Sequence, residues 1–230
     1  LGDLWILGDH KILCGDSADV TQIEKLLGDE KADLVFTDPP YLLETRGGEN
    51  SGLGRELNKQ AASIESISDF NPADFLAVLP SVFAKNHNSF IFCNRYLLPD
   101  YLNWAVDSKL SFNVLIWKKP PSMPIGSGHH PDIEYLLFFK KNAIWNCGLK
   151  DVSYSRVIEE KRELGEHPTM KPIPLIENQL LLSSNKDSVV FYFFLGSGST
   201  LIACEKTGRV CRGLELEPKY IDVIIKRWEK

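Results

Sequence analysis

Hydrophobic residues follow two alternating patterns along this chain. Short apolar runs rich in Val, Ile and Phe, typical of buried strands, alternate with longer stretches whose apolar residues recur at helical spacing. This alternation predicts an α/β fold built on a mostly parallel sheet. The seven predicted strands are 11–14, 33–37, 89–93, 113–117, 134–139, 188–194 and 210–216. The six predicted helices are 20–27, 72–85, 99–108, 173–182, 199–206 and 218–229.

Two segments do not fit either pattern. Residues 42–68 are polar and contain glycines, and residues 142–166 mix charges with little periodicity. Both are predicted to be surface excursions from the sheet. Three predicted helices, by contrast, begin with a proline, which costs least in a first turn, at Asn71-Pro72, Leu98-Pro99 and Glu217-Pro218.

Composition indicates one domain. The chain has 230 residues, of which 43% are hydrophobic and 25% charged, enough for a single large core. No apolar run approaches the roughly 20 residues of a membrane span, and no secretion signal opens the chain. We therefore expect a soluble, cytoplasmic protein without a membrane partner. Because the chain begins at Leu1 and not at Met, a missing upstream domain is left open.

Charge and cysteine content narrow the function. A net charge of −5 argues against a uniformly basic nucleic-acid binder, although an enzyme can grip DNA on one face and be acidic elsewhere. The five cysteines show no paired metal-ligand spacing, so we expect reduced thiols and no metal site. Four of them lie in apolar runs, which leaves Cys147 as the exposed one.

The first chemical signal is the tetrapeptide Asp38-Pro39-Pro40-Tyr41, which directly follows the strand 33–37. Ligands of open α/β sheets bind at the carboxyl ends of the strands. The two prolines fix φ, remove amide donors and force the preceding residues into extended conformations. A carboxylate that faces solvent, a carbonyl acceptor and an aromatic ring are thus predicted side by side. They suit a planar ring that carries an NH2 group, although a merely rigid turn remains the alternative.

The second signal is a glycine turn between the strand 188–194 and the helix 199–206. Glycines there let a ligand approach the backbone, and the helix N-terminus offers free N–H groups. The following strand ends in Glu215, where an acidic residue would hold the ribose hydroxyls of an adenosine-bearing cofactor. A dinucleotide-binding fold is the rival interpretation, but it would usually carry this turn on its first strand. The turn reads Phe194-Leu195-Gly196-Ser197-Gly198-Ser199-Thr200.

Taken together, these motifs resemble the β-class DNA amino-methyltransferases, which methylate N6 of adenine or N4 of cytosine. The resemblance covers nearly the whole chain and implies a single-domain, Rossmann-like methyltransferase fold with circularly permuted motif order. A catalytic half of about residues 1–140 would precede a cofactor half of about 167–230, with target-recognition insertions at 42–68 and 142–166. The motifs that carry it also include Gly15-Asp16-Ser17, Asn94-Arg95-Tyr96, Trp117-Lys118-Lys119-Pro120 and His167-Pro168-Thr169-Met170-Lys171-Pro172.

The resemblance also implies roles for individual residues. Asp38 and the Pro39 carbonyl would accept hydrogens from the target amine, in a turn stiffened by Pro40, and Tyr41 would stack on the base. For S-adenosylmethionine, Asp16 and the backbone near Ala18 would hold the adenine, and Glu215 the ribose. The residues expected at its methionine end are Asp38, His167, Lys171, Phe194, Gly196, Ser197, Gly198 and Ser199. The residues alone leave two alternatives open, a helix N-cap for Asp16 and a solvated loop for 167–171.

Tyr192 departs from the family pattern, which usually has an acidic residue at the end of this strand to meet the cofactor ammonium. Either its ring fills that space and weakens cofactor binding, or it points into the core between Phe191 and Phe193 while another acid, such as Asp38, meets the ammonium. A DNA-binding homologue with a degenerate cofactor site is therefore one alternative function. The others are N4-cytosine methylation, which more often goes with serine in place of Asp38, and methylation of protein amides or RNA.

The predicted reaction is methylation of N6 of an adenine flipped out of double-stranded DNA, because a stacked base is out of reach. No cysteine nucleophile is required. A homodimer would supply a second grip on the DNA. The sequence also predicts that the strand 188–194 lies beside the strand 33–37, since only that adjacency brings Asp38 and Gly196 to one edge of the sheet.

Overall fold

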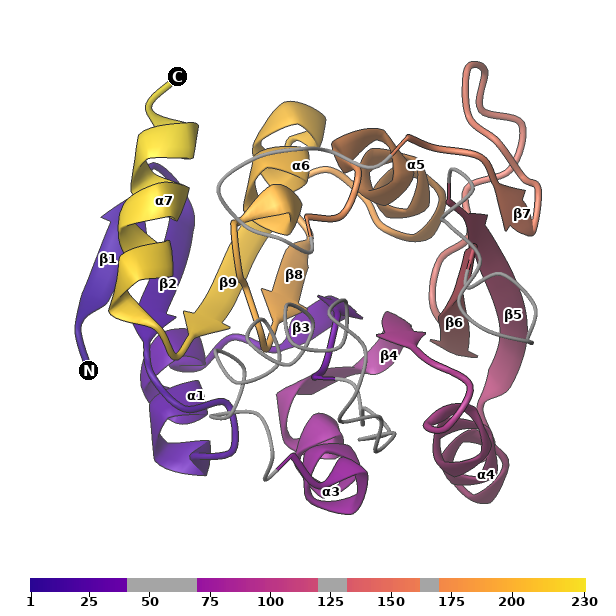
Figure 1. Ribbon diagram of the computed structural model, residues 1–230, viewed down its shortest axis with the longest axis horizontal. Helices are drawn as coiled ribbons and strands as arrows, with labels where there is room; N and C mark the ends of the chain where they lie inside the picture. The colour runs from indigo at the N-terminus through magenta and orange to yellow at the C-terminus, as the bar shows by residue number, and fades with distance from the viewer. Residues whose placement is uncertain (41–69, 120–131, 162–169) are drawn as a thin grey trace, which may run out of the picture.

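The computed structural model describes residues 1–40, 70–119, 132–161 and 170–230 (Figure 1). Tyr41, His167 and the segment 42–68 lie outside the described residues, as does the last part of 142–166. The described strands are β1 (Leu4–Leu7), β2 (His10–Cys14), β3 (Ala32–Thr37), β4 (Phe83–Cys93), β5 (Ser111–Lys118), β6 (Ile133–Lys141), β7 (Val157–Ile158), β8 (Val189–Tyr192) and β9 (Val210–Glu215). The described helices are α1 (Val20–Leu27), α3 (Pro72–Val82), α4 (Leu98–Asp107), α5 (Ile173–Ser183), α6 (Ser199–Thr207) and α7 (Pro218–Trp228).

These strands form one sheet in the order β1-β2-β9-β8-β3-β4-β6-β5-β7. Its centre, from β2 to β4, is parallel, whereas β6 runs antiparallel to both of its neighbours. The α/β fold and the mostly parallel sheet are thus confirmed. Among the described residues the sheet has nine strands and not the seven predicted, because two short strands, β1 and β7, extend its edges. Four and two residues long, they are too short to produce a period-2 signal of their own.

Helices cover both faces of the sheet (Figure 1). Buried residues of α5, α6 and α7 pack on one face in a cluster that includes Phe36 and Tyr192. Those of α1, α3 and α4 pack on the other face in a second cluster, which includes Phe191 and Phe193. Both faces of the central strands are therefore buried, which explains why these strands are nearly continuous apolar runs.

Local chemistry sets the ends of the helices. Asn71 caps α3 by accepting a hydrogen bond from the Ala73 amide at 3.0 Å, as its position before proline predicts. The helix ends at Val82, three residues earlier than predicted, because Phe83 is extended and pairs with Ala32. Strand β4 therefore starts earlier than residue 89.

The predicted adjacency of two strands far apart in sequence is confirmed. Leu34 of β3 pairs with Val190 of β8, and Val35 pairs with Phe191, in parallel. Asp38 follows β3 and Gly196 follows β8, so both lie at the carboxyl edge of the sheet. The Asp-Pro-Pro turn and the glycine turn therefore lie at the same edge, and the first precedes the second in the chain, as the permuted order requires.

The described part of the unassigned segment, residues 142–161, has no buried residue. It runs over the surface and contributes only β7, which pairs with β5. Cys147 in this segment is exposed, and the other four cysteines are buried, as predicted. No helix among the described residues is long and apolar enough to cross a membrane.

Candidate active site

Asp38 directly follows β3, and it is held in place by a lysine. Its carboxylate oxygen Oδ2 accepts a hydrogen bond from Lys171 Nζ at 2.5 Å. The Asp38 side chain is 17% exposed and that of Lys171 7%. The expectation that Asp38 faces solvent is therefore wrong. Lys171 lies two residues before the start of α5. Its contact with Asp38 joins the first half of the chain to the second half.

Glu134 completes the surroundings of Lys171. It lies at the start of β6, which is antiparallel, so its side chain reaches the edge where the parallel strands end. Glu134 Oε2 is 3.3 Å from Lys171 Nζ, and Oε1 is 2.9 Å from Lys119 Nζ. Burial alone would raise the pKa of Glu134, but the two lysines outweigh it and lower the pKa. For Lys171, burial would lower the pKa, but the charges of Asp38 and Glu134 raise it. Glu134 and Lys171 are thus both charged at neutral pH.

Three further titratable groups face Asp38 from other elements, and each stays neutral. Burial, followed by the Asp38 charge, raises the pKa of the Cys93 thiol on β4 to about 12. Burial and then nearby charges, that of Asp38 among them, also raise the pKa values of Tyr101 on α4 and Tyr192 on β8. These three neutral side chains and the charged Lys171 and Glu134 thus surround Asp38.

Glu215 is the second buried carboxylate at this edge, at the end of β9. Its Oε2 accepts the Gly196 amide at 2.6 Å, and its Oε1 accepts the Glu217 amide at 2.9 Å. Burial raises the pKa of Glu215 above its usual value, and these backbone hydrogen bonds oppose the rise. The structure thus joins two predicted residues, because the carboxylate is fastened to the glycine turn.

The glycine turn requires its glycines. Gly196 and Gly198 have φ values of 55° and 81°, where other residues are strained. A Cβ on Gly198 would also lie 2.9 Å from Ile224. Helix α6 begins directly after this turn at Ser199. The turn can therefore keep the backbone close to a ligand, as its sequence predicts.

Ser197 and Ser199 are tied to a residue that sequence reasoning missed. Arg227 of α7 donates to the carbonyl of Ser197 at 2.7 Å and lies 3.1 Å and 3.4 Å from the hydroxyls of Ser197 and Ser199. Both serines are buried. No motif flags Arg227, because an arginine in the last turn of a helix normally interacts with the helix dipole. Phe194, the first residue of this segment, packs against Phe70 and Phe75.

Asp16 follows β2, which neighbours β9. Its Oδ1 accepts the Ala18 amide at 2.8 Å, and its side chain is exposed. The N-cap of α1 is Asp19, whose carboxylate accepts the Thr21 amide at 2.9 Å. The N-cap alternative for Asp16 is therefore wrong. Asp16, Glu215 and Asp38 lie at or just after the carboxyl ends of three parallel strands of the same sheet, so all three are at one edge.

The sequence pattern of the DNA methylase family matches residues 32–227, which include this whole edge apart from Asp16. The chain belongs to the DNA methylase family. Membership implies S-adenosylmethionine as the methyl donor.

Two relatives of this DNA methylase are Type II methyltransferases. M2.LlaDCHI of Lactococcus lactis subsp. cremoris is 26% identical over 93% of this chain and 88% of its own. M.HinfI of Haemophilus influenzae is 28% identical over 95% of this chain and 68% of its own. At these identities, the relatives agree with the family assignment and leave the target base open.

Solved structures share the fold of this DNA methylase. The complex of M1.HpyAVI with SAM is 22% identical, covers 94% of this chain and 98% of its own, and has a TM-score of 0.71. The cytosine-N4-specific PvuII DNA methyltransferase is 14% identical, covers 95% and 86%, and has a TM-score of 0.69. The single-domain methyltransferase fold that the motifs imply is thus confirmed.

Tyr192 lies between the two buried carboxylates of the methylase, on the strand between β3 and β9. Its ring is stacked on Phe36, with 6.5 Å between ring centroids, on the sheet face opposite Phe191 and Phe193. Tyr192 thus points into the core, as the second alternative predicts, but on the opposite face of the sheet from Phe191 and Phe193. Its pKa responds to both Asp38 and Glu215. The Tyr192 ring thus lies below the site, between Asp38 and Glu215.

Glu134 and Lys119 are the other residues that sequence reasoning missed as part of this site. A signal for Glu134 was present, since it is an acidic residue next to the apolar run of its strand, 135–139. Lys119 was included only in a family motif. What could not be predicted is that an antiparallel strand carries Glu134 to the edge where Asp38 lies.

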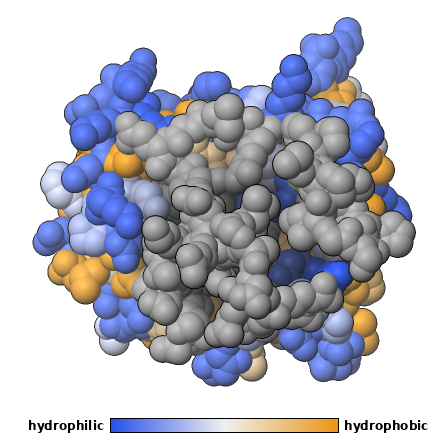
Figure 2. Space-filling model, viewed as in Figure 1, coloured by the Kyte–Doolittle hydropathy of each residue, from blue (hydrophilic) through white to orange (hydrophobic). Residues whose placement is uncertain are grey.

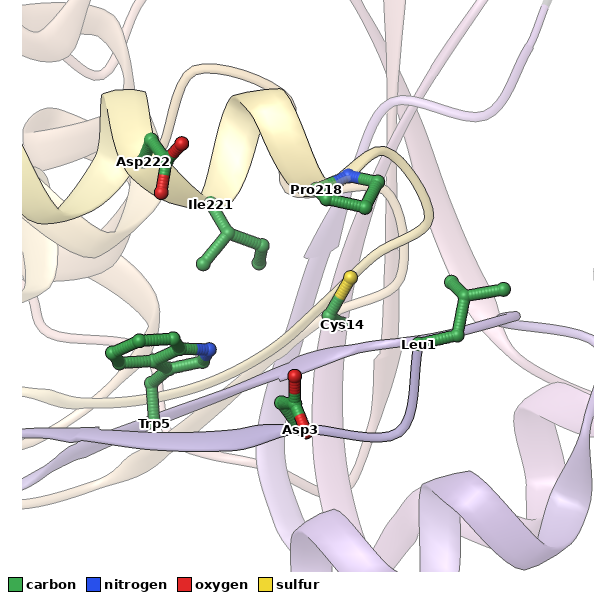
Figure 3. A pocket seen from close by; sticks show the side chains of 7 residues that line it. All are labelled: Leu1, Asp3, Trp5, Cys14, Pro218, Ile221 and Asp222. Atoms are coloured by element: carbon green, nitrogen blue, oxygen red, sulfur yellow. The ribbon is translucent and has the colours of Figure 1, made fainter.

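A small cleft of about 120 Å³ lies beside this edge, between β1 and the start of α7 (Figure 3). The Cys14 thiol in it faces the Leu216 carbonyl at 3.9 Å, so the cleft adjoins the end of β9. Its lining contains none of the predicted site residues. Leu1 and Trp5 of the lining are exposed hydrophobic residues. Figure 2 shows hydrophobic residues at several places around the rim of the visible face, among hydrophilic ones. The lining residues are Leu1, Asp3, Trp5, Cys14, Pro218, Ile221 and Asp222.

Proposed function

We propose that this DNA methylase is site-specific, of the Type II kind, and methylates N6 of an adenine flipped out of double-stranded DNA. The observation that carries the proposal is the ion pair of Asp38 with Lys171, at the edge that also carries the glycine turn. An ionised carboxylate only accepts hydrogen bonds, so it suits an amine donor.

Asp38 and the Pro39 carbonyl act on the amine by orienting it. The adenine amine is a poor nucleophile because its lone pair is delocalised into the ring. If both N–H groups are accepted outside the ring plane, the amine becomes pyramidal and its lone pair can attack. Positioning of this kind supplies most of the rate. As the bond from the amine nitrogen to the methyl group forms, the bond from the methyl group to the sulfonium sulfur would break and leave a neutral thioether, and the methylated amine would release one proton to water.

Tyr41, outside the described residues, is proposed to stack on the flipped base. Flipping costs a few kcal/mol of unstacking. Stacking on an aromatic ring recovers about 1–3 kcal/mol of this. Residues 42–68 and 142–166 are the proposed target-recognition segments, and a homodimer would add a second grip on the DNA. The exposed surface of 142–161 supports this role for the second segment.

The residues at the carboxyl edge fit S-adenosylmethionine, which supplies an electrophilic methyl group on a sulfonium. Glu215 is an acceptor fastened to the glycine turn, which suits ribose hydroxyls, and Asp16 offers an exposed acceptor for an adenine amine. Phe194, Gly196, Ser197, Gly198 and Ser199 would line the methionine end, and His167 would lie near its carboxylate. Since Tyr192 is neutral, Asp38 is the proposed partner of the ammonium.

The second candidate is methylation of N4 of cytosine, favoured by the shared fold with the cytosine-N4-specific PvuII enzyme. The cytosine amine presents the same two hydrogens. Adenine is preferred here because Asp38 stands where enzymes that act on cytosine more often have serine. The Asp also disfavours protein amides and RNA as substrates.

Mass spectrometry of nucleosides tests the proposal. DNA of mixed sequence is incubated with the protein and with S-adenosylmethionine that carries a deuterated methyl group, then digested. Labelled N6-methyldeoxyadenosine is the expected product. Labelled N4-methyldeoxycytidine would replace the proposal with the second candidate. Unlabelled DNA, with cofactor binding intact by calorimetry, would instead indicate a DNA-binding homologue.

A further inference from the structure

The methylase contains a largely buried ion cluster, in which Glu134 belongs to none of the family motifs. Two carboxylates and two ammonium groups, from Asp38, Glu134, Lys171 and Lys119, lie beside the proposed target amine. We propose that Lys171 is a positioning residue that holds the Asp38 carboxylate for the target amine, and that Glu134 holds Lys171. This inference rests on the proposed function, because it assigns Asp38 to the amine.

The Lys171 ammonium is confined on three sides. It donates to Asp38 Oδ2 at 2.5 Å, lies 3.3 Å from Glu134 Oε2, and lies 4.7 Å from the centre of the Phe92 ring. Phe92 is fully buried on β4, and the backbone after Lys171 is fixed by Pro172, the N-cap of α5. A long side chain held at both ends loses little further freedom when the substrate binds. Asp38 therefore meets its substrate already oriented.

Glu134 gives the cluster its balance. Lys171 and Asp38 form one pair of opposite charges, and Glu134 adds a second carboxylate that holds Lys171 from another side. Lys119 pairs with Glu134 at 2.9 Å and offsets the added negative charge. The two carboxylates and two ammonium groups sum to zero net charge. Removing one partner of a buried ion pair leaves the other uncompensated, so each member constrains the rest.

This arrangement changes the role that the family resemblance implies for Lys171. An ammonium has three donor hydrogens, and two carboxylates already face this one. The positive charge of Lys171 is thereby balanced by Asp38 and Glu134. The carboxylate of the cofactor must then rely on other groups, such as the free N–H groups at the start of α6.

The pH dependence of single-turnover methyl transfer tests the inference with Lys171→Met. A nearby opposite charge lowers a carboxyl pKa by about 1–3 units, so its loss should move the acidic limb of the profile to higher pH by about that amount. Among the described residues, the other groups that face Asp38 are Cys93, Tyr101 and Tyr192, which stay neutral, and Glu134. An acidic limb at the wild-type pH would overturn the inference.

Three further variants separate positioning from a merely structural role. Lys171→Arg keeps the charge and should restore a limb close to that of wild type. Glu134→Gln removes a like charge and should move the limb to lower pH, opposite to Lys171→Met. Lys206→Met is the matched control, because Lys206 pairs with Glu177 at 3.4 Å on the surface and should leave the profile unchanged.

If Lys171→Met does not fold, the double variant Lys171→Met with Glu134→Gln keeps the inference testable. It removes one charge of each sign, so the interior stays balanced, but Asp38 still lacks its partner. The acidic limb should therefore remain at high pH in the double variant. A folded double variant with the wild-type limb would contradict the inference.

A direct titration separates this inference from the proposed function. Carbon-13 labelling of aspartate carboxyl groups reports the pKa of Asp38 by NMR in wild type and in Lys171→Met, without DNA or turnover. A raised pKa in the variant supports the pairing even if wild type methylates no base, in which case the proposed function alone fails. An unchanged pKa overturns the inference even if the wild-type enzyme is active.

Discussion

Two carboxylates, the partly buried Asp38 after β3 and the buried Glu215 at the end of β9, flank Tyr192 at the same edge of the sheet, but they are held by different means. A side-chain ammonium, Lys171, holds Asp38 at 2.5 Å. Backbone amides of Gly196 and Glu217 hold Glu215 at 2.6 Å and 2.9 Å. Burial raises the pKa of Glu215. Asp38, in contrast, is paired with the full positive charge of the Lys171 ammonium.

The difference matches what each carboxylate is proposed to bind. Ribose hydroxyls stay neutral, so an acceptor fixed by the backbone is sufficient for them. A target amine becomes positive as it reacts, so its acceptor must stay ionised, which requires a counter-charge. The position of Asp38 therefore depends on side chains far away in the sequence, and the position of Glu215 depends on backbone amides. Substitutions at the two carboxylates, and at Tyr192 between them, test this difference.

The largest effect is expected from Tyr192→Asp, between the two carboxylates. Tyr192 is 5% exposed and packs in the core against Phe36, so the variant loses a buried ring and places a third carboxylate beside Asp38 and Glu215. We expect the free energy of unfolding to fall by about 3–5 kcal/mol, with no tighter cofactor binding. Denaturant titration and calorimetry measure both quantities.

Tyr192→Phe is the matched control, because it keeps the ring and removes only the hydroxyl. Its loss should stay near 0.5–1.5 kcal/mol, typical of one hydrogen bond. Tighter binding of S-adenosylmethionine by Tyr192→Asp at unchanged stability would show instead that the ring occupies the place of an acidic residue. Position 192 would then be a third place at this edge where an acidic residue can bind the cofactor.

A smaller effect is expected from Glu215→Ala on cofactor affinity. Hydrogen bonds to a charged group are typically worth 1.5–3 kcal/mol, which corresponds to a roughly 10–100-fold rise in the Kd of S-adenosylmethionine. Part of that rise would come from the Gly196 amide, which loses its acceptor. Calorimetric titration measures the Kd, with Glu229→Ala on the surface as control. A Kd equal to that of wild type would remove Glu215 from the cofactor site.

The sequence predicts the fold because its local and long-range signals agree. Apolar strand runs, proline at helix starts and the glycine turn each specify an element, and the motif order required β3 beside β8, which the pairing of Leu34 with Val190 confirms. The edge strand β1 escaped prediction because four residues give too little pattern.

The site was predictable only where backbone chemistry marks it. The Asp-Pro-Pro turn and the glycine turn carry their signals in the residues themselves. The surroundings of Asp38 carry none, because Lys171 lies 133 positions away along the chain and Glu134 reaches the edge through an antiparallel strand. Such pairing depends on tertiary packing, and it reversed the expectation that Asp38 faces solvent.

The most direct test of the account is single-turnover methyl transfer by Asp38→Asn, measured with cofactor affinity and thermal unfolding on the same preparation. The amide keeps the shape of the side chain but presents only one acceptor oxygen, so methyl transfer should fall below about a tenth of wild type, a loss of at least about 1.4 kcal/mol in the transition state. The protein should remain folded, because Lys171 retains Glu134 as a partner. A folded variant that keeps more than about a tenth of the wild-type rate would contradict the role of Asp38 and, with it, the proposed division of labour between the two carboxylates.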